Sequence, residues 1–305
     1  MELGTHDGRF GFLIFLGAFV LLEALWLIFV RKSAYQWGHT AASFGVAALK
    51  RGADMLTGGI AAAILFWAYR HRIATIEIDS AGTLIVAFLA VEFVYYWHHR
   101  WAHQVRWLWA THGVHHTAPH MNLSVAGRLG WTGLLSGSVL FFAPLAYIGF
   151  HPAAIFLLLA ASLFYQIWLH TELVPHLGPL EWVFNTPSNH RVHHGSNPEY
   201  LDRNFGGVLM VYDVLFGTYA REKPDTPVVY GVVEPMDSKN PFVISTYEWL
   251  RMARDVARAR GIGQVLGFLF GRPGWRPQAR PDGAPEKIEK MPGCGMDGPP
   301  PTSKG

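Results

Sequence analysis

Three short clusters of histidine constrain this 305-residue chain more than any other feature of its sequence. These histidine boxes contain His99 and His103, then His112, His115 and His116, and finally His190, His193 and His194. Within each box most of the spacings are three or four residues, so in a helix the rings project from one face. Each box can therefore direct its imidazoles at a common point, which is the geometry of a metal site.

The number of histidines indicates more than one metal ion. A zinc site in a protein usually has three or four protein ligands, so eight convergent imidazoles predict a two-metal centre. A single histidine in an apolar stretch is usually packed and hydrogen-bonded. Ten of the sixteen histidines, however, fall within residues 98–120 and 190–194, and neither a packed core nor a solvated surface requires such clustering.

His170 is a ninth candidate ligand, at the end of an apolar run and directly before Thr171 and Glu172. An imidazole at this place could coordinate one metal ion or hydrogen-bond a metal-bound water. It could equally cap the helix, because the helix dipole favours histidine at a C-terminus. The sequence leaves these alternatives open.

The composition is that of a membrane protein. Half of the residues are apolar and only 15% are charged, whereas soluble domains carry about 25% charged residues. Apolar runs cover residues 10–30, 55–69, 81–97, 129–150 and 152–169. Since a bilayer core needs about 20 apolar residues, they predict an all-α, polytopic integral membrane protein with about five membrane helices, two of them short.

The order of the runs places all the boxes on one side of the membrane. The third helix delivers the first two boxes, and the next two helices form a hairpin that returns residues 170–194 to the same side. Four basic residues in the loop after the first helix belong to this side, and their excess indicates that it is cytoplasmic, whereas Arg70 and Arg72 argue mildly against it. The loop residues meant are Arg31, Lys32, Lys50 and Arg51.

From residue 171 the chain is polar and turn-rich, which predicts a cap folded over the metal site. Residues 246–270 alternate apolar and basic groups, as in an interfacial helix or a surface helix of the cap. Residues 271–305 are rich in proline and glycine and have little to bury, so we expect a disordered tail after a membrane-embedded domain of residues 1–270.

Several functions are excluded or disfavoured. The formal net charge of +3 and the lack of a Lys/Arg-rich block give no support to nucleic-acid binding. The only cysteine, Cys294, excludes disulfides within the chain and thiolate metal sites. The pattern Gly-x-Gly-x-x-Gly occurs only at residues 293–298, in the Pro/Gly-rich tail and not between a strand and a helix, so it does not indicate a bound flavin or nicotinamide.

The boxes and several motifs between them resemble the sterol desaturase and fatty acid hydroxylase superfamily of membrane di-iron oxygenases, and within it the branch of alkylglycerol monooxygenase-like bacterial proteins. The motifs are LWATH at 108–112, NLS at 122–124, HTEL at 170–173, NTPS at 185–188, DRNFGG at 202–207 and DVLFGT at 213–218. Together they cover about residues 90–222. Two positions depart from the resemblance: Pro119-His120 replaces an expected acidic residue, and Glu92 stands where aspartate is commoner.

The resemblance implies two iron ions, although imidazole alone also suits zinc, copper or nickel. It implies an oxygen-dependent oxidation of a C–H bond in a lipid, whether a sterol, a fatty acyl chain or an ether lipid. Hydroxylation is the first choice and desaturation the alternative. Electrons would come from a separate donor, either a partner reductase or a reduced pterin.

Four residues are predicted to hold the ligating rings through hydrogen bonds: Glu92, Glu172, Asp202 and Asn204. Glu92 precedes His99 by seven residues, or two helical turns, and the other three follow boxes or box-like histidines. For Asp202 and Asn204, a role in helix capping or turn formation is an equal alternative.

Two functions of other classes compete with an oxygenase. A divalent-metal transporter would also explain histidines in a helix bundle, but its ion site would lie near the bilayer midplane rather than at helix ends. A membrane zinc hydrolase would use His-Glu-x-x-His, which this chain lacks, and would not need eight imidazoles.

Overall fold

The structure of the chain is a computed structural model that describes the backbone of residues 7–277 and the side chains of residues 17–277. Within this part the chain forms helices joined by loops, without a β-strand, and pairs its extended segments only at isolated bridges. The prediction of an all-α chain is confirmed for these residues.

The long helices are α1 (Asp7–Phe29), α2 (Trp37–Arg70), α3 (Ala81–Gln104) and α7 (Pro152–Tyr165), which η3 (Gln166–Leu169) continues. Three segments among the described residues are long and apolar enough to cross a membrane: α2, α3 and α7 with η3. The side chains described in α1, from residue 17 onward, form a shorter apolar segment. These helices support a membrane protein, and the count of five spans stays a prediction.

Helix α2 runs from Trp37 to Arg70 and so begins well before the apolar run at 55–69. Lys50 and Arg51 therefore lie inside this helix, and their assignment to the loop after the first helix is wrong. The Lys50 ammonium lies 2.8 Å from the Asp54 carboxylate one turn later, so these charges are compatible with a continuous helix. Only Arg31 and Lys32 remain as basic residues of the loop between α1 and α2.

The helix expected over residues 129–150 is broken into three pieces, α5 (Gly133–Ser136), η2 (Ser138–Phe141) and α6 (Ala143–Ile148). Gly137 separates the first two in the left-handed conformation, at φ 78°. Pro144 has no backbone N–H and starts a new helix. The expectation of one continuous helix over 129–150 is therefore wrong, and residues 138–148 form a shorter apolar segment before α7.

A large apolar core joins the C-terminal part of α2, the N-terminal parts of α3 and α7, and α6. Its buried residues are Leu65, Ala68, Ala87, Val91, Phe142, Leu145, Ala146, Phe150 and Ile155. Helix α1 is held to the remainder by a buried carboxylate, Glu23. One Glu23 oxygen accepts a hydrogen bond from the Thr171 hydroxyl at 2.5 Å, and the other accepts from the Leu123 amide at 2.7 Å.

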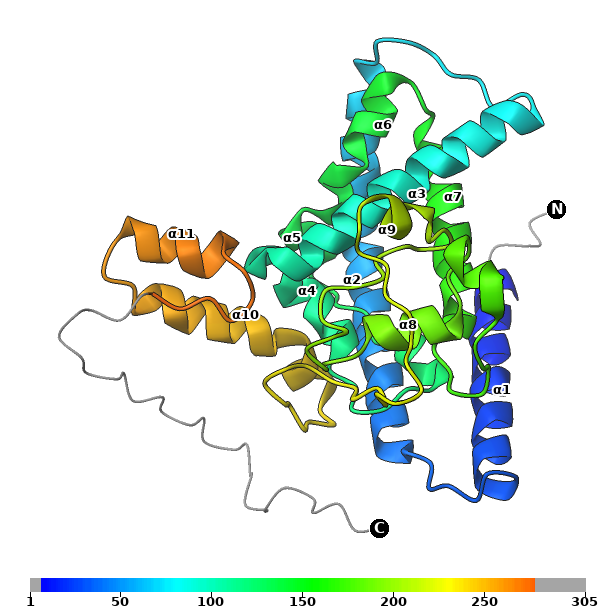
Figure 1. Cartoon of the computed structure of the whole chain (residues 1–305). Helices are drawn as coiled ribbons and strands as arrows, with labels where there is room; N and C mark the ends of the chain where they lie inside the picture. The colour runs from blue at the N-terminus through cyan, green and yellow to red at the C-terminus, as the bar shows by residue number, and fades with distance from the viewer. Residues whose placement is uncertain (1–6, 278–305) are drawn as a thin grey trace.

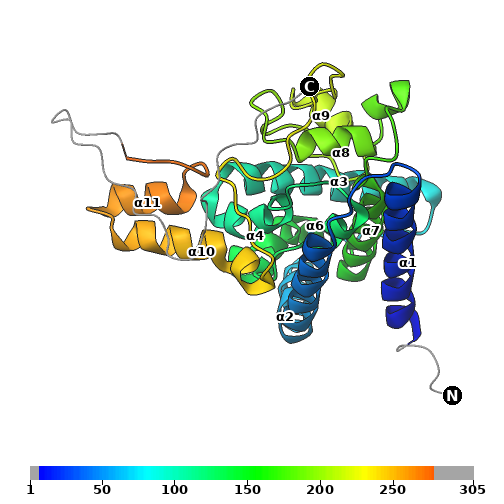
Figure 2. The same ribbon diagram turned by 90° about the horizontal axis from the view of Figure 1, so that it is seen from below.

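The remaining short elements lie around the ends of these helices: α4 (Arg106–His116), η1 (Leu123–Gly127), η4 (Gly178–Trp182), α8 (Pro187–His193) and α9 (Val211–Leu215). Figure 2 shows α8 and α9 on one side of α3, whereas α1, α2, α6 and α7 extend from its other side. We call residues 171–240 the cap, and it covers the end of α3 that carries the first box.

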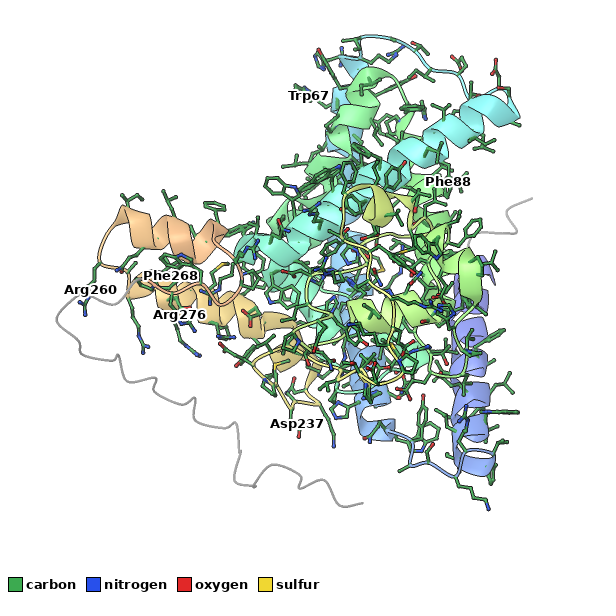
Figure 3. The ribbon with its side chains drawn as sticks, viewed as in Figure 1. Trp67, Phe88, Asp237, Arg260, Phe268 and Arg276 are labelled. Atoms are coloured by element: carbon green, nitrogen blue, oxygen red, sulfur yellow. The ribbon has the colours of Figure 1, made fainter. Side chains whose placement is uncertain are left out.

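Two helices form an arm beside α4, α10 (Pro241–Ala257) and α11 (Ile262–Phe270), in place of the single helix expected over 246–270 (Figure 1). The buried Arg106 guanidinium of α4 lies 2.6 Å from the Asp255 carboxylate of α10. Residues 271–277 fold back onto α11, where Trp275 packs against Phe268, which Figure 3 labels on this arm. The rest of the expected tail lies outside the described residues.

Candidate metal centre

The first two boxes face each other because the chain bends sharply between their helices. Box one occupies the last turns of α3, and box two occupies α4. Val105, between the helices, has an extended conformation with φ −116° and ψ 117°. The break lets α4 fold back, so that its histidines meet those of α3.

The third box lies on the short helix α8, whose start is fixed by side chains. The Thr186 hydroxyl accepts from the Asn189 amide at 3.3 Å and donates to the buried Glu181 carboxylate at 2.9 Å. The Asn189 side chain donates to the Glu181 carbonyl, also at 2.9 Å. These bonds fix the cap segment that presents His190 and His193.

The structure brings all nine predicted ligand residues together, in two groups. The five-histidine group consists of His99, His103, His112, His116 and His193, and the four-histidine group consists of His115, His170, His190 and His194. Within each group one ring nitrogen per residue lies within 4.8 Å of those of all the others. Every member except His112, which is half-buried, is buried.

The nitrogens that face one another are mainly Nε2 atoms at short distances. In the five-histidine group, Nε2 of His112 lies 3.0 Å from that of His99 and 3.1 Å from that of His116. In the four-histidine group, Nε2 of His170 lies 3.1 Å from that of His115 and 2.9 Å from that of His190. Two imidazole nitrogens bound at right angles to one ion, each about 2.1 Å from it, would be separated by about 3 Å.

In both groups, the rings whose Nδ1 faces a backbone carbonyl, those of His99, His193 and His170, carry a lone pair on Nε2. The Nδ1–H of His99 donates to the Phe205 carbonyl at 2.8 Å, and that of His193 donates to the Arg203 carbonyl at 3.0 Å. A neutral imidazole with its proton on Nδ1 has only a lone pair on Nε2. Buried lone pairs that face one another repel unless a cation lies between them, so the residues fit a metal ion in each group.

Burial also keeps the rings in the form that binds metals. It lowers the pKa of His190, His193 and His194 well below the ordinary value, and neighbouring histidines lower it further. Burial lowers the pKa of His170 to about 4. These rings are neutral at physiological pH, and neutral imidazole is the metal-binding form.

Of the four predicted supporting residues, Asp202 lies beside a ligating ring. Its carboxylate is 3.5 Å from Nδ1 of His103. Glu92 instead accepts from the Ser162 hydroxyl at 2.6 Å and from the Val208 amide at 2.7 Å. Two helical turns separate Glu92 from His99 by about 10 Å along the axis, which is too far for a direct bond. The geometric reason given for Glu92 as a support of His99 is thus wrong.

The other two predicted supports bond to groups other than a box histidine. Tyr230 hydrogen-bonds to the exposed Glu172. The Asn204 side chain donates to the carbonyls of Asn189 at 2.9 Å and Ala220 at 2.8 Å. Asn204 has φ 56°, a conformation that asparagine tolerates better than most residues. It acts on the site by linking α8 to residue 220 within the cap.

The sequence did not reveal which groups accept hydrogen bonds from the histidine rings. Most of these acceptors are backbone carbonyls. Asp213 positions one of these carbonyls: its carboxylate accepts from the amides of Phe205 at 2.8 Å and Gly206 at 2.7 Å, and from the Thr218 hydroxyl at 2.6 Å. The DVLFGT motif contains both Asp213 and Thr218. That motif was the only sequence signal for this support.

One cavity adjoins the centre, and a second lies beside the residues that precede His170. A cavity of about 230 Å³ opens on the five-histidine group, where His103, His116 and His193 line it together with Trp109 and Asp202. A second cavity, of about 310 Å³, is almost wholly apolar and lies between α1 and the segment of α7 and η3. Its lining is Phe19, Leu123, Ala161, Phe164, Tyr165, Ile167 and Trp168.

Comparison with known proteins gives relatives of one kind. Residues 84–218 match the family model "Fatty acid hydroxylase". The alkylglycerol monooxygenase of Xenopus tropicalis is 36% identical over 257 residues, which cover 84% of this chain and 56% of that protein. The human alkylglycerol monooxygenase is 38% identical over 224 residues, which cover 73% of this chain and 49% of that protein.

A bacterial relative, the ornithine lipid hydroxylase of Rhizobium tropici, is 31% identical over 140 residues, or 46% of this chain and 42% of that protein. No solved structure matches the chain. The chain spans about half the length of the curated relatives it matches. The segment that matches the family model contains all nine clustered histidines. The chain is a member of the fatty acid hydroxylase superfamily and is similar to the alkylglycerol monooxygenases within it.

Proposed function

We propose that the chain is an oxygen-dependent lipid hydroxylase with one iron ion in each histidine group. The observation that carries the proposal is the pair of buried groups whose Nε2 lone pairs face one another within the fatty acid hydroxylase segment. Imidazole alone also binds other metals, so the choice of iron rests on the family. The relatives named as hydroxylases and monooxygenases favour hydroxylation over desaturation.

Bound iron would reduce dioxygen and supply the oxidant for an unactivated C–H bond. The balance of the reaction is one oxygen atom in the new hydroxyl group and one in water, with two electrons and two protons taken up. The chain's own residues hold the site: carbonyls of Phe205, Arg203 and Gln166 fix the rings of His99, His193 and His170. We propose a separate reductase or a reduced pterin as the electron donor.

The apolar cavity is our proposed site for the hydrocarbon chain of the substrate. Ile167 and Trp168 of its lining belong to η3, which ends directly before His170. The cavity therefore lies about one turn from the four-histidine group. Because its lining is nearly all apolar, a hydrocarbon chain that enters it leaves no polar group of the protein without a hydrogen bond. Glycerol ether lipids are the first substrates to test, since alkylglycerol monooxygenases of two organisms are among the relatives named above.

Metal analysis combined with oxygen consumption tests the proposal. Protein purified in detergent should contain about two iron ions per chain, one for each group of ligands. Oxygen uptake should require a glycerol ether lipid, tested both as the free alkylglycerol and as its phosphate ester, and a reductant, supplied either as a reduced pterin or as a flavoprotein reductase. A single zinc ion, with no reductant-dependent oxygen uptake, would end the oxygenase proposal.

We propose that the cap and the metal centre face the cytoplasm. Arg31 and Lys32 lie in the loop between α1 and α2, which Figure 2 shows near the cap, and basic loops favour the cytoplasmic side. In a Cys294→Ser background, Ser80→Cys before α3 should react with an impermeant maleimide in intact cells, whereas Glu199→Cys in the cap should not. Both positions are exposed in the structure. Equal labelling of the two would refute this topology.

A further inference from the structure

A buried arginine, Arg128, lacks a counter-ion. It follows η1 and is 1% exposed. Its Nη1 donates to the Thr117 hydroxyl at 3.1 Å, but Nε and Nη2 are buried and have no hydrogen-bond partner among the described residues. Burial lowers the pKa of Arg128 to about 10, which still leaves the guanidinium charged at neutral pH.

The other buried arginines of the described chain show what Arg128 is missing. Arg106, also 1% exposed, pairs with Asp255 at 2.6 Å. Arg191, 7% exposed, pairs with Glu222 at 2.7 Å. No carboxylate oxygen of the described residues lies within 4.0 Å of the Arg128 guanidinium. A buried charge without a partner is strongly unfavourable, so an anion from outside the described chain is the expected partner.

Two histidines beside Arg128 have unused ring nitrogens. Neither ring nitrogen of His120 has a hydrogen-bond partner, nor does Nδ1 of the buried His39. Their ring centroids are 5.2 Å apart. Thr117 already uses its hydroxyl proton on the Val114 carbonyl at 2.8 Å. The cluster therefore offers several donors, which are the complement of an oxyanion, and the carboxylate beside it is that of Asp237, near Nε2 of His39.

The position of the cluster connects the metal centre with the surface. Thr117 directly follows His116, a member of the five-histidine group. On the other side, Nε2 of His39 lies 3.6 Å from the carboxylate of Asp237, whose side chain is 83% exposed and is labelled in Figure 3 in the loop before α10. His39 lies in the first turn of α2, at the end of this helix that faces the cap. If α2 crosses a bilayer, this end lies at the level of the lipid headgroups.

We propose that Arg128, His39 and His120 form a binding site for an oxyanion, a phosphate or carboxylate, carried by the headgroup of the lipid substrate. The assignment to substrate rests on the proposed hydroxylase function, whereas the oxyanion site itself does not. The Arg128 guanidinium binds two oxygens of the anion through Nε and Nη2, and the histidines donate to the others. The headgroup is thereby held beside the metal centre while its hydrocarbon chain lies in the membrane.

Binding to protein purified in a neutral detergent tests the site without turnover. The probes are dihexanoyl phosphatidic acid, inorganic phosphate and uncharged dihexanoylglycerol, measured by titration calorimetry. We expect phosphatidic acid to bind and dihexanoylglycerol not to bind at the same site. Arg128→Gln should weaken phosphatidic acid at least tenfold, the usual effect of losing a charge-assisted hydrogen bond. Arg106→Gln, the matched buried arginine with its own partner, should leave the affinity unchanged.

Iron content, measured on every variant, shows whether the fold and the metal centre survive. If Arg128→Gln cannot be purified with iron, His120→Ala replaces it, with an expected weakening of several-fold. Phosphatidic acid that binds better than inorganic phosphate supports the headgroup assignment, and equal binding supports the oxyanion site but overturns that assignment. Binding that is absent, or equal in the wild type and both variants, overturns the site. A protein that binds phosphatidic acid but consumes no oxygen refutes the hydroxylase function alone.

Discussion

The two histidine groups use the same chemistry in different surroundings. The five-histidine group borders a cavity of about 230 Å³ and has the Asp202 carboxylate beside His103. All members of the four-histidine group are buried, and His170 comes from the end of η3 beside the apolar cavity. The five-histidine group therefore has a cavity at its edge, whereas the four-histidine group is enclosed by protein.

The groups also show that a histidine box is not a metal site. His115 and His116 are neighbours in the sequence but belong to different groups, and so do His193 and His194. Successive residues of a helix point about 100° apart, so adjacent histidines face different ways. Each of these boxes contributes to both groups, which fixes the two groups side by side.

The largest effect is expected when a box histidine of either group is replaced by alanine. His193→Ala and His115→Ala should each reduce turnover at least a thousandfold, because the reaction proposed above uses an ion in each group. Each variant should lose about one iron ion and still insert into the membrane, since its apolar helices are unchanged. His71→Ala, at an exposed helix end, is the control. Near-normal iron and activity in His193→Ala would show that the third box does not bind metal.

A smaller and more selective effect is expected for His170→Gln. Its Nε2 lies within 3.1 Å of those of His115 and His190, so we expect a weakened four-histidine group and an intact five-histidine group. Iron content and turnover, measured together, separate the possible roles. Loss of one iron ion identifies a ligand, and retained iron with slow turnover identifies a hydrogen-bonding support. Full iron and full turnover would mean that His170 only caps η3.

The smallest effect is expected for Asp202→Asn, and only in the five-histidine group. Removing a carboxylate beside a ligating histidine typically lowers metal affinity about 10-fold to 100-fold. Iron retained during dialysis against a chelator measures this, with the four-histidine group as the internal reference. Asp225→Asn, an exposed cap carboxylate, is the control. Equal loss from both groups would contradict a local role for Asp202.

The sequence predicted the nine clustered histidines because spacings of three and four residues survive in any helix. It could not divide them between two groups, since that depends on the bend at Val105 and on the placement of α8. The limits of α2 were missed because Lys50 and Arg51 interrupt its hydropathy, although Asp54 neutralises one of them. The broken segment at 129–150 was missed because an apolar run hides the left-handed turn at Gly137. The ring acceptors are backbone carbonyls, which no residue type reveals.

The carboxylate of Glu23 constrains the order in which the chain assembles during synthesis. Its partners, Leu123 and Thr171, come 100 and 148 residues later in the sequence. At about 5–20 residues per second, α1 waits about 7–30 s for the second of them. An unpaired carboxylate in hydrocarbon costs about 2.5–3.5 kcal/mol, which is enough to keep α1 from settling deeply on its own. Helix α1 thus completes these two hydrogen bonds only after residue 171 has been made, so a delay in translation before that residue prolongs the time that Glu23 spends unpaired.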